Sequence, residues 1–135
     1  MSDRTRVLIV DDDVNLSRLL CLMLEKTRMY EVLVENRSAD AVEKARALRP
    51  ELILLDVDMP GKSGGQVARE LQADPVLKNT KIIFITALLS KNQESMQSSV
   101  RTDMRYLSKP VDSMTLLDTI EDVLSDVAAP FTPAA

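Results

Sequence analysis

Five short apolar segments alternate along this chain with stretches whose apolar residues recur at helical spacing. The segments are residues 6–10, 30–35, 52–55, 81–85 and 105–108. The run from Leu52 to Leu55 is apolar without a break, which is typical of a strand buried on both faces of a sheet. Strands that alternate with helices form a parallel sheet with helices on both faces. The pattern therefore predicts an α/β fold of the (βα)₅ type with a parallel five-stranded sheet.

The expected helices are about 13 residues from Val14, then residues 39–48, 64–73 and 90–100, and a closing segment up to residue 127. An aspartate at 11–13 is expected to cap the first helix, Ser38 the second, and Asp112 or Ser113 the last, because such side chains accept hydrogen bonds from free amides. Residues 1–127 are predicted to form one domain. Residues 128–135 contain two prolines and little to bury, so we expect a flexible tail or the start of a linker.

Composition narrows the classes of function. With 45% hydrophobic and 28% charged residues, the 135 residues predict one soluble globular domain, and a net charge of −4 argues against direct nucleic-acid binding. No apolar run approaches the ~20 residues of a membrane span, and the polar N-terminus does not resemble a signal peptide. The single cysteine, Cys21, permits no internal disulfide, which favours a cytoplasmic location. The chain has no histidine, which excludes histidine-based catalytic triads.

Polar residues follow four of the five apolar segments. Asp11 and Asp12 follow the first, Asp56 the third, Thr86 the fourth and Lys109 the fifth. Because the carboxyl ends of parallel strands lie on one edge of the sheet, we expect these side chains to meet in one cleft. In the strand order 2-1-3-4-5, strands one and three flank the switch point, so Asp12 and Asp56 would face each other.

This set of side chains suits phosphoryl chemistry. Clustered carboxylates repel unless a cation lies between them, and Mg²⁺ prefers carboxylate and phosphate oxygens. A lysine and a threonine hydroxyl suit phosphoryl oxygens, and a carboxylate is a recognised phosphoryl acceptor. Each residue alone has an ordinary structural explanation: Asp56 as the start of a turn, Thr86 as a strand end, Lys109 as a surface lysine. Their occurrence together at consecutive strand ends favours the functional interpretation.

The chain resembles the receiver domain of two-component response regulators over residues 5–127. The motifs that carry the resemblance are Val-Asp11-Asp12, Leu-Leu-Asp56-Val-Asp-Met-Pro-Gly, Ile-Thr86-Ala87 and Lys109-Pro110. The resemblance implies a flavodoxin-like three-layer sandwich. It also implies a phosphoacceptor that catalyses only its own phosphorylation and dephosphorylation, and is not otherwise an enzyme.

Carried onto these positions, the resemblance implies that Asp56 accepts phosphate from a histidine kinase or a histidine phosphotransfer protein. Mg²⁺ would be held by Asp12 directly, by Asp11 mainly through water, by Asp56, and by the main-chain carbonyl of Asp58. The missing histidine is consistent with this role, because the phosphodonor is another protein.

The resemblance also implies how the phosphoryl group is held and sensed. Thr86, Lys109 and the amide of Ala87 would bind its oxygens, and Thr86 would move with Tyr106 as a switch. A face built from residues 90–100, the fifth strand and the last helix would then signal to a downstream protein or output domain. Tyr106 is equally typical of a half-buried aromatic at a sheet edge. A homodimer through the last helix and strand stays open.

Some positions depart from the family pattern, and two other functions remain open. Residues 101–105 replace the usual Gly-Ala pair, and Ser38-Ala39-Asp40 stands where a glycine is common before the second helix. The Asp56-Val-Asp58 sequence also matches the signature of haloacid-dehalogenase-type phosphatases, which would turn over a small phosphate ester. Finally, the fold could serve as a docking module that works without phosphorylation.

Overall fold

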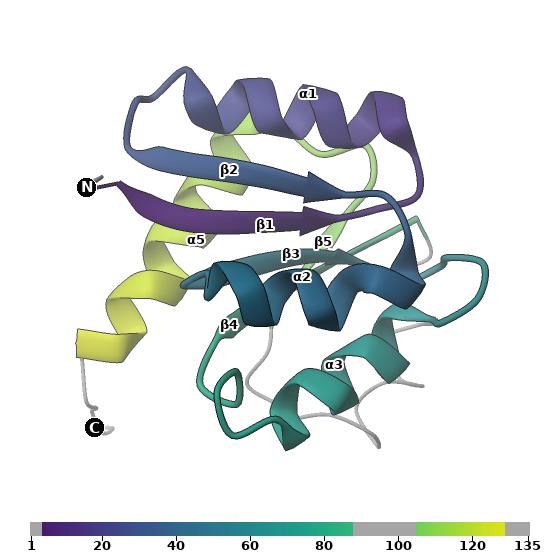
Figure 1. Ribbon diagram of the computed structural model, residues 1–135. Helices are drawn as coiled ribbons and strands as arrows, with labels where there is room; N and C mark the ends of the chain where they lie inside the picture. Colours follow the sequence, from purple (N-terminus) through teal and green to yellow (C-terminus); the bar gives the residue numbers. More distant parts are fainter. Residues whose placement is uncertain (1–3, 88–104, 129–135) are drawn as a thin grey trace.

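The computed structural model describes residues 4–87 and 105–128 (Figure 1). Its elements in chain order are β1 (Thr5–Val10), α1 (Val14–Glu25), β2 (Tyr30–Glu35), the 3₁₀ turn η1 (Ser38–Asp40), α2 (Ala41–Leu48), β3 (Leu52–Asp56), α3 (Gly64–Ala73), β4 (Lys81–Thr86), β5 (Arg105–Ser108) and α5 (Ser113–Ala128). The helix expected over residues 90–100 lies outside the described residues, as does the tail beyond Ala128.

The five strands form one parallel sheet in the order β2-β1-β3-β4-β5, which confirms the predicted fold class and strand order. The register places the ends of the strands side by side. Val10 lies opposite Leu55, and Asp56 lies opposite Ile85. The residues that follow the strands therefore gather at a single edge of the sheet.

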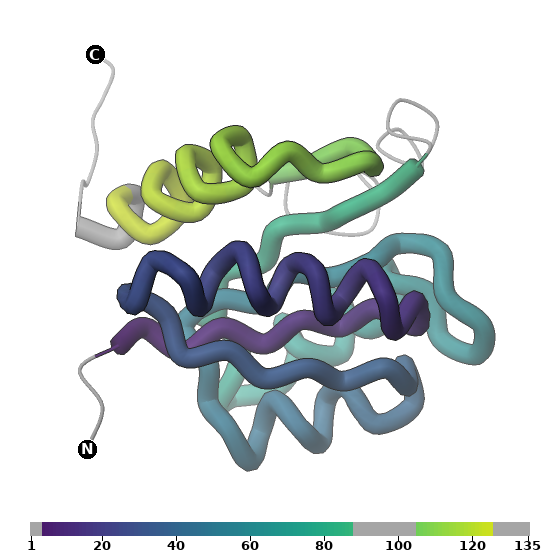
Figure 2. The backbone as a smooth tube through the Cα atoms, turned by 90° about the horizontal axis from the view of Figure 1, so that it is seen from above, coloured from purple at the N-terminus to yellow at the C-terminus, as the bar shows by residue number. Residues whose placement is uncertain are grey.

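The sheet separates two apolar cores, which accounts for the unbroken apolar strands. Alternate residues of each strand point to opposite faces. On β3, Ile53 and Leu55 pack with α2 and α3, whereas Leu52 and Leu54 pack with α1 and α5. Figure 2 shows α1 and α5 next to each other on one face of the sheet. Within the described parts of the chain, no helix is long and apolar enough to cross a membrane.

Two of the three expected helix caps form, one does not, and a further helix is capped by a residue that was not predicted. The Asp13 side chain accepts from the amide of Leu16 at 3.0 Å, and the Asp112 side chain accepts from the amide of Thr115 at 2.9 Å. Ser63 caps α3 through the amide of Gln66. The prediction that Ser38 caps the second helix is wrong. Its hydroxyl bonds to the loop after β3 instead, and the segment begins with a 3₁₀ turn that has no side-chain cap.

Candidate functional site

The residues expected at the functional site do meet at the carboxyl edge of the sheet. Asp56 and Thr86 are the last residues of β3 and β4, and both are buried. Asp11 directly follows β1 and is buried, whereas Asp12 beside it is exposed. Lys109 follows β5, and its backbone amide donates to the carbonyl of Thr86 at 2.9 Å, which ties the end of β5 to that of β4. The lysine side chain is thereby held over the ends of β1 and β3.

Three carboxylates come together at this edge. One oxygen of each of Asp11, Asp12 and Asp56 lies within 4.8 Å of the other two. The Asp58 side chain is exposed and does not belong to this group, but its amide lies 3.4 Å from Asp56 Oδ1. The resemblance assigned a metal-binding role to the Asp58 carbonyl, not to its carboxylate, so that role stays a prediction.

Lys109 is the cation that accompanies these carboxylates. Its Nζ lies 3.2 Å from Asp56 Oδ1 and 3.6 Å from Asp11 Oδ2. Burial alone would lower the pKa of Lys109, but the two carboxylates outweigh that effect and raise it above its ordinary value. The lysine is therefore firmly charged.

One lysine does not fully compensate the buried acids. Burial, together with the neighbouring Asp11 carboxylate, raises the pKa of Asp56 from 3.8 to about 7, although Lys109 acts in the opposite direction. Asp11 Oδ2 and Asp56 Oδ2 are buried and have no hydrogen-bond partner among the described residues. Asp11 Oδ2 has the ion pair with Lys109 at 3.6 Å, but buried oxygens without a hydrogen bond are rare, and a bound ion is one recognised explanation. Oxygen-only ligands beside unsatisfied carboxylates suit Mg²⁺.

Sequence reasoning missed one residue that orients the site. Asn36 Nδ2 donates to the main-chain oxygen of Asp11 at 2.7 Å and to Ser17 Oγ at 3.0 Å. The Asp11 carboxylate is fixed separately, because its Oδ1 accepts from the amide of Asp13 at 2.9 Å. The available signal was position: Asn36 directly follows β2, as Asp11 follows β1.

Tyr106 on β5 is compatible with both of its interpretations, a switch residue and an ordinary half-buried aromatic at the sheet edge. It is half-buried, and its ring stacks on Phe84 with 5.1 Å between the ring centroids. Its hydroxyl is buried and has no hydrogen-bond partner within the described ranges, and burial raises the pKa of Tyr106. The stacking fits an ordinary edge aromatic, and the unpaired hydroxyl fits a side chain with a second orientation. Its switch role stays a prediction.

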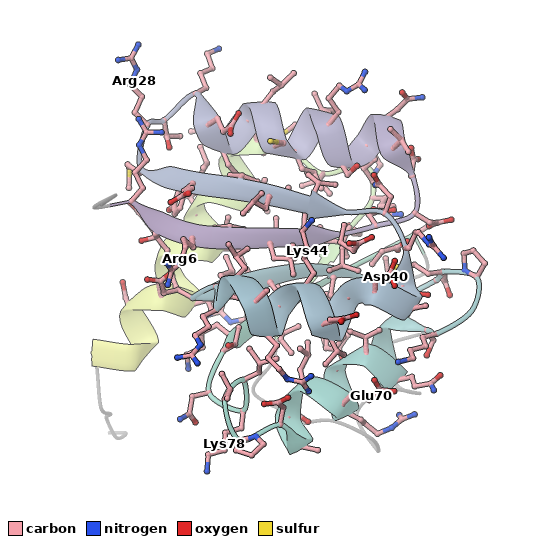
Figure 3. All side chains as sticks on the ribbon, in the orientation of Figure 1. Arg6, Arg28, Asp40, Lys44, Glu70 and Lys78 are labelled. Atoms are coloured by element: carbon pink, nitrogen blue, oxygen red, sulfur yellow. The ribbon has the colours of Figure 1, made fainter. Side chains whose placement is uncertain are left out.

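Charged side chains of both signs lie at the carboxyl end of the sheet, where Arg37, Lys62 and Lys109 accompany the acidic residues. Figure 3 shows Arg6 and Arg28 at the end where the strands begin, and Asp40 at the end where they finish. The carboxylates of the site lie at this second end. The three clustered carboxylates attract a cation, and neutralising their charge favours the approach of an anionic phosphoryl donor.

Comparisons with known proteins agree with this geometry. Residues 7–121 match the family described as the response regulator receiver domain. The chain is 39% identical over 122 residues to Protein PilH of Pseudomonas aeruginosa, with 89% of this chain and 98% of that protein covered.

Solved structures show the same fold. The chemotaxis protein CheY4 of Vibrio cholerae matches with a TM-score of 0.81 and 28% identity, covering 89% of this chain and 98% of that one. The receiver domain of the sensor histidine kinase PA1611 from Pseudomonas aeruginosa matches with a TM-score of 0.81 and 25% identity, covering 90% and 98%. That structure carries a magnesium ion coordinated in its active-site cleft.

The phosphatase alternative was wrong, because the matched family accounts for most of the chain. This chain belongs to the response regulator receiver domain family and has a receiver role in two-component signalling.

Proposed function

We propose that this receiver accepts a phosphoryl group on Asp56 from the phosphohistidine of a sensor histidine kinase or a histidine phosphotransfer protein. The observation that carries the proposal is the environment of the Asp56 carboxylate. Its Oδ1 is paired with Lys109 at 3.2 Å, while its buried Oδ2 has no hydrogen-bond partner among the described residues. An ionised carboxylate held in place by one oxygen leaves the other available as a nucleophile.

The chemistry is a single transfer. Asp56 Oδ2 forms a P–O bond while the P–N bond of the donor phosphohistidine breaks, and the electron pair of that bond returns to the imidazole. Lys109 lies close enough to stabilise the negative charge on the transferred phosphoryl oxygens, because its Nζ already contacts the carboxylate that becomes the acyl phosphate. Thr86 ends the neighbouring strand, and Ala87 follows it in the exposed loop, so both lie at the edge where phosphoryl oxygens would sit.

Receiver domains bind Mg²⁺ at an acidic site, and the residues present here fit that ion. Asp11, Asp12 and Asp56 would hold it, with the Asp58 carbonyl completing the protein ligands. When bound, Mg²⁺ neutralises charge on the carboxylates and the phosphoryl oxygens. The exposed Asp12 leaves one side of the group open to water and to a phosphodonor.

Phosphorylation would be read out on the side of β5 and α5. New bonds to the phosphoryl oxygens would draw on Thr86 and Lys109, which a backbone hydrogen bond already links. Tyr106 lies on β5, and its buried hydroxyl has no hydrogen-bond partner among the described residues, so turning the side chain would break no hydrogen bond to them. A downstream protein, an output domain or a second copy of the chain would bind this face.

Intact mass after incubation with acetyl phosphate tests the proposal. We expect wild type to gain one phosphate in the presence of Mg²⁺ and none in excess EDTA. Asp56→Asn is expected to gain none, because an amide oxygen is a poor nucleophile. Asp58→Asn is the matched control and should still be phosphorylated, since the Asp58 carboxylate is exposed and lies outside the acidic group.

A wild type that stays unmodified with acetyl phosphate is next given phosphorylated histidine kinases and phosphotransfer proteins. Transfer from any of them supports the proposal. If no donor phosphorylates the chain, the phosphoacceptor role is refuted and the docking module takes its place. That module also predicts that Asp56→Asn binds its partner as tightly as wild type does.

Magnesium is expected to stabilise the protein more at pH 8 than at pH 5.5. Asp56, with a pKa near 7, is largely protonated at the lower pH, and a proton competes with the cation for its oxygens. Mg²⁺ at ten times its Kd should add about 1.4 kcal/mol to the free energy of unfolding at pH 8. Thermal unfolding with MgCl₂ or with NaCl of equal ionic strength measures the difference. An equal gain at both pH values would contradict ligation by Asp56.

A further inference from the structure

Ser38 occupies an unusual place for a residue of the β2–α2 connection. It lies in η1, at the end of the sheet that Asp40 marks in Figure 3, and the residue is only 5% exposed. Its hydroxyl donates to the carbonyl of Pro60 at 2.8 Å and accepts from the amide of Lys62 at 3.0 Å. A single oxygen therefore satisfies one acceptor and one donor of a different loop.

That loop, residues 57–63, leads from the phosphoacceptor strand to α3 and carries Asp58. The two bonds from Ser38 bracket Gly61, which has a φ of +81°. A Cβ at Gly61 would lie 3.2 Å from Ser38 Oγ, so the loop lies directly against the hydroxyl. Glycine is the residue that takes this conformation without strain.

The same loop is also held from the side of α3. Lys62 Nζ pairs with Glu70 Oε1 at 2.8 Å, and the amide of Gly64 donates to the carbonyl of Val57 at 2.8 Å. The backbone of Lys62 is thus tied to Ser38 and its side chain to Glu70. Removing the Ser38 hydroxyl would release the backbone at Pro60 and Lys62, while the Lys62–Glu70 ion pair and the bond from Gly64 to Val57 remain.

We propose that Ser38 is a positioning residue for the metal and phosphoryl site, which it reaches through the loop that carries Asp58. The proposal rests on the function proposed above. Ser38 is not expected to touch the phosphoryl group. It fixes the backbone at 60–62, and so limits where the Asp58 main chain lies beside Asp56. Residues that orient the ligands of a metal commonly change its affinity 10- to 100-fold when they are removed.

Calorimetric titration with MgCl₂ alone tests the proposal. We expect Ser38→Ala to weaken Mg²⁺ binding about tenfold and Ser38→Thr, which keeps the hydroxyl, to restore most of it. Ser63→Ala is the matched control from the same loop. It removes the cap of α3 and should cost about 1 kcal/mol of stability, but should leave the Kd for Mg²⁺ unchanged.

Amide hydrogen exchange gives the second measurement. The Lys62 amide, bonded to Ser38 Oγ in wild type, should exchange faster in Ser38→Ala and at the wild-type rate in Ser63→Ala. If wild type binds Mg²⁺ and Ser38→Ala binds it equally well, Ser38 has only a structural role. If wild type itself binds no Mg²⁺, the metal site of the proposed function fails, and the positioning role fails with it.

Discussion

Asp56→Asn should make this protein more stable in magnesium-free buffer, by about 2 to 4 kcal/mol at pH 8. The reason is the raised pKa of the buried Asp56 carboxyl, about 7 compared with 3.8 for the ordinary group. The folded protein holds the proton more tightly than the unfolded chain does. Above pH 7 the fold must bury an ionised carboxylate beside Asp11, and asparagine avoids that cost.

The raised pKa of Asp56 determines how the stability of the wild type changes with pH. Below about pH 3.8 Asp56 is protonated in both states, and it costs the wild type nothing. As the pH rises from there to about 7, the unfolded state loses its proton first, so the stability of wild type falls. Above that range the cost is constant. The advantage of Asp56→Asn is therefore expected to be small at pH 4, to grow to pH 7 and to level off.

Chemical denaturation at several pH values measures the effect, and Asp74→Asn is the matched control. Asp74 is also a buried aspartate, but its side chain accepts from Arg46 Nε at 2.9 Å and from the amide of Val76 at 2.8 Å. The bond from Arg46 lowers the pKa of Asp74, so the same substitution should destabilise the protein at pH 8. If both variants change stability in the same direction, burial of the ionised Asp56 carboxylate does not destabilise the fold.

A buried Asp56 carboxylate that destabilises the fold also favours metal binding. Binding of a cation offsets the cost of the bare charge, so the folded protein is expected to gain free energy when the acidic site takes up a metal ion. This links the opposite effects expected for Asp56→Asn: higher stability without Mg²⁺ and no phosphate uptake. A residue kept only for stability would not show both.

Most of the fold could be predicted from the sequence, because the periodicity of apolar residues is a local property of each segment. The apolar runs at β1 and β3 and the helical spacing in α1 could be recognised without any tertiary information. The rule that parallel strands end at one edge of the sheet then predicts that Asp11, Asp56 and Lys109 lie together. The strand order and the meeting of these side chains agree with that prediction.

Hydrogen bonds between loops that are distant in sequence could not be predicted from the periodicity of the chain. Ser38 was expected to act locally as a cap, but its partners lie 22 and 24 residues away. The bond from Asn36 to Asp11 spans 25 residues. A hydroxyl or an amide can bond in many directions, and its sequence neighbours do not show which one the fold selects.

Gly64→Ala is expected to lower the free energy of unfolding by about 3 kcal/mol, although helix propensity predicts the opposite sign. Gly64 is the first residue of α3, where alanine is usually favourable. A Cβ at this position would lie 2.3 Å from the carbonyl oxygen of Asp56 and 2.8 Å from the Cα of Val57. Both are backbone atoms, which no change of side-chain rotamer can move out of the way.

Gly64→Ala should also reduce phosphorylation, because the backbone that must move belongs to Asp56, the proposed phosphoacceptor, and to Val57. Separating α3 from β3 lengthens the 2.8 Å bond from the Gly64 amide to Val57 and shifts Asp56 relative to Lys109. Denaturation curves and phosphate uptake from acetyl phosphate should therefore decline together. Gln66→Ala, at an exposed position of the same helix turn, should change neither by much. A Gly64→Ala variant as stable as Gln66→Ala would mean that α3 does not approach β3 this closely in solution.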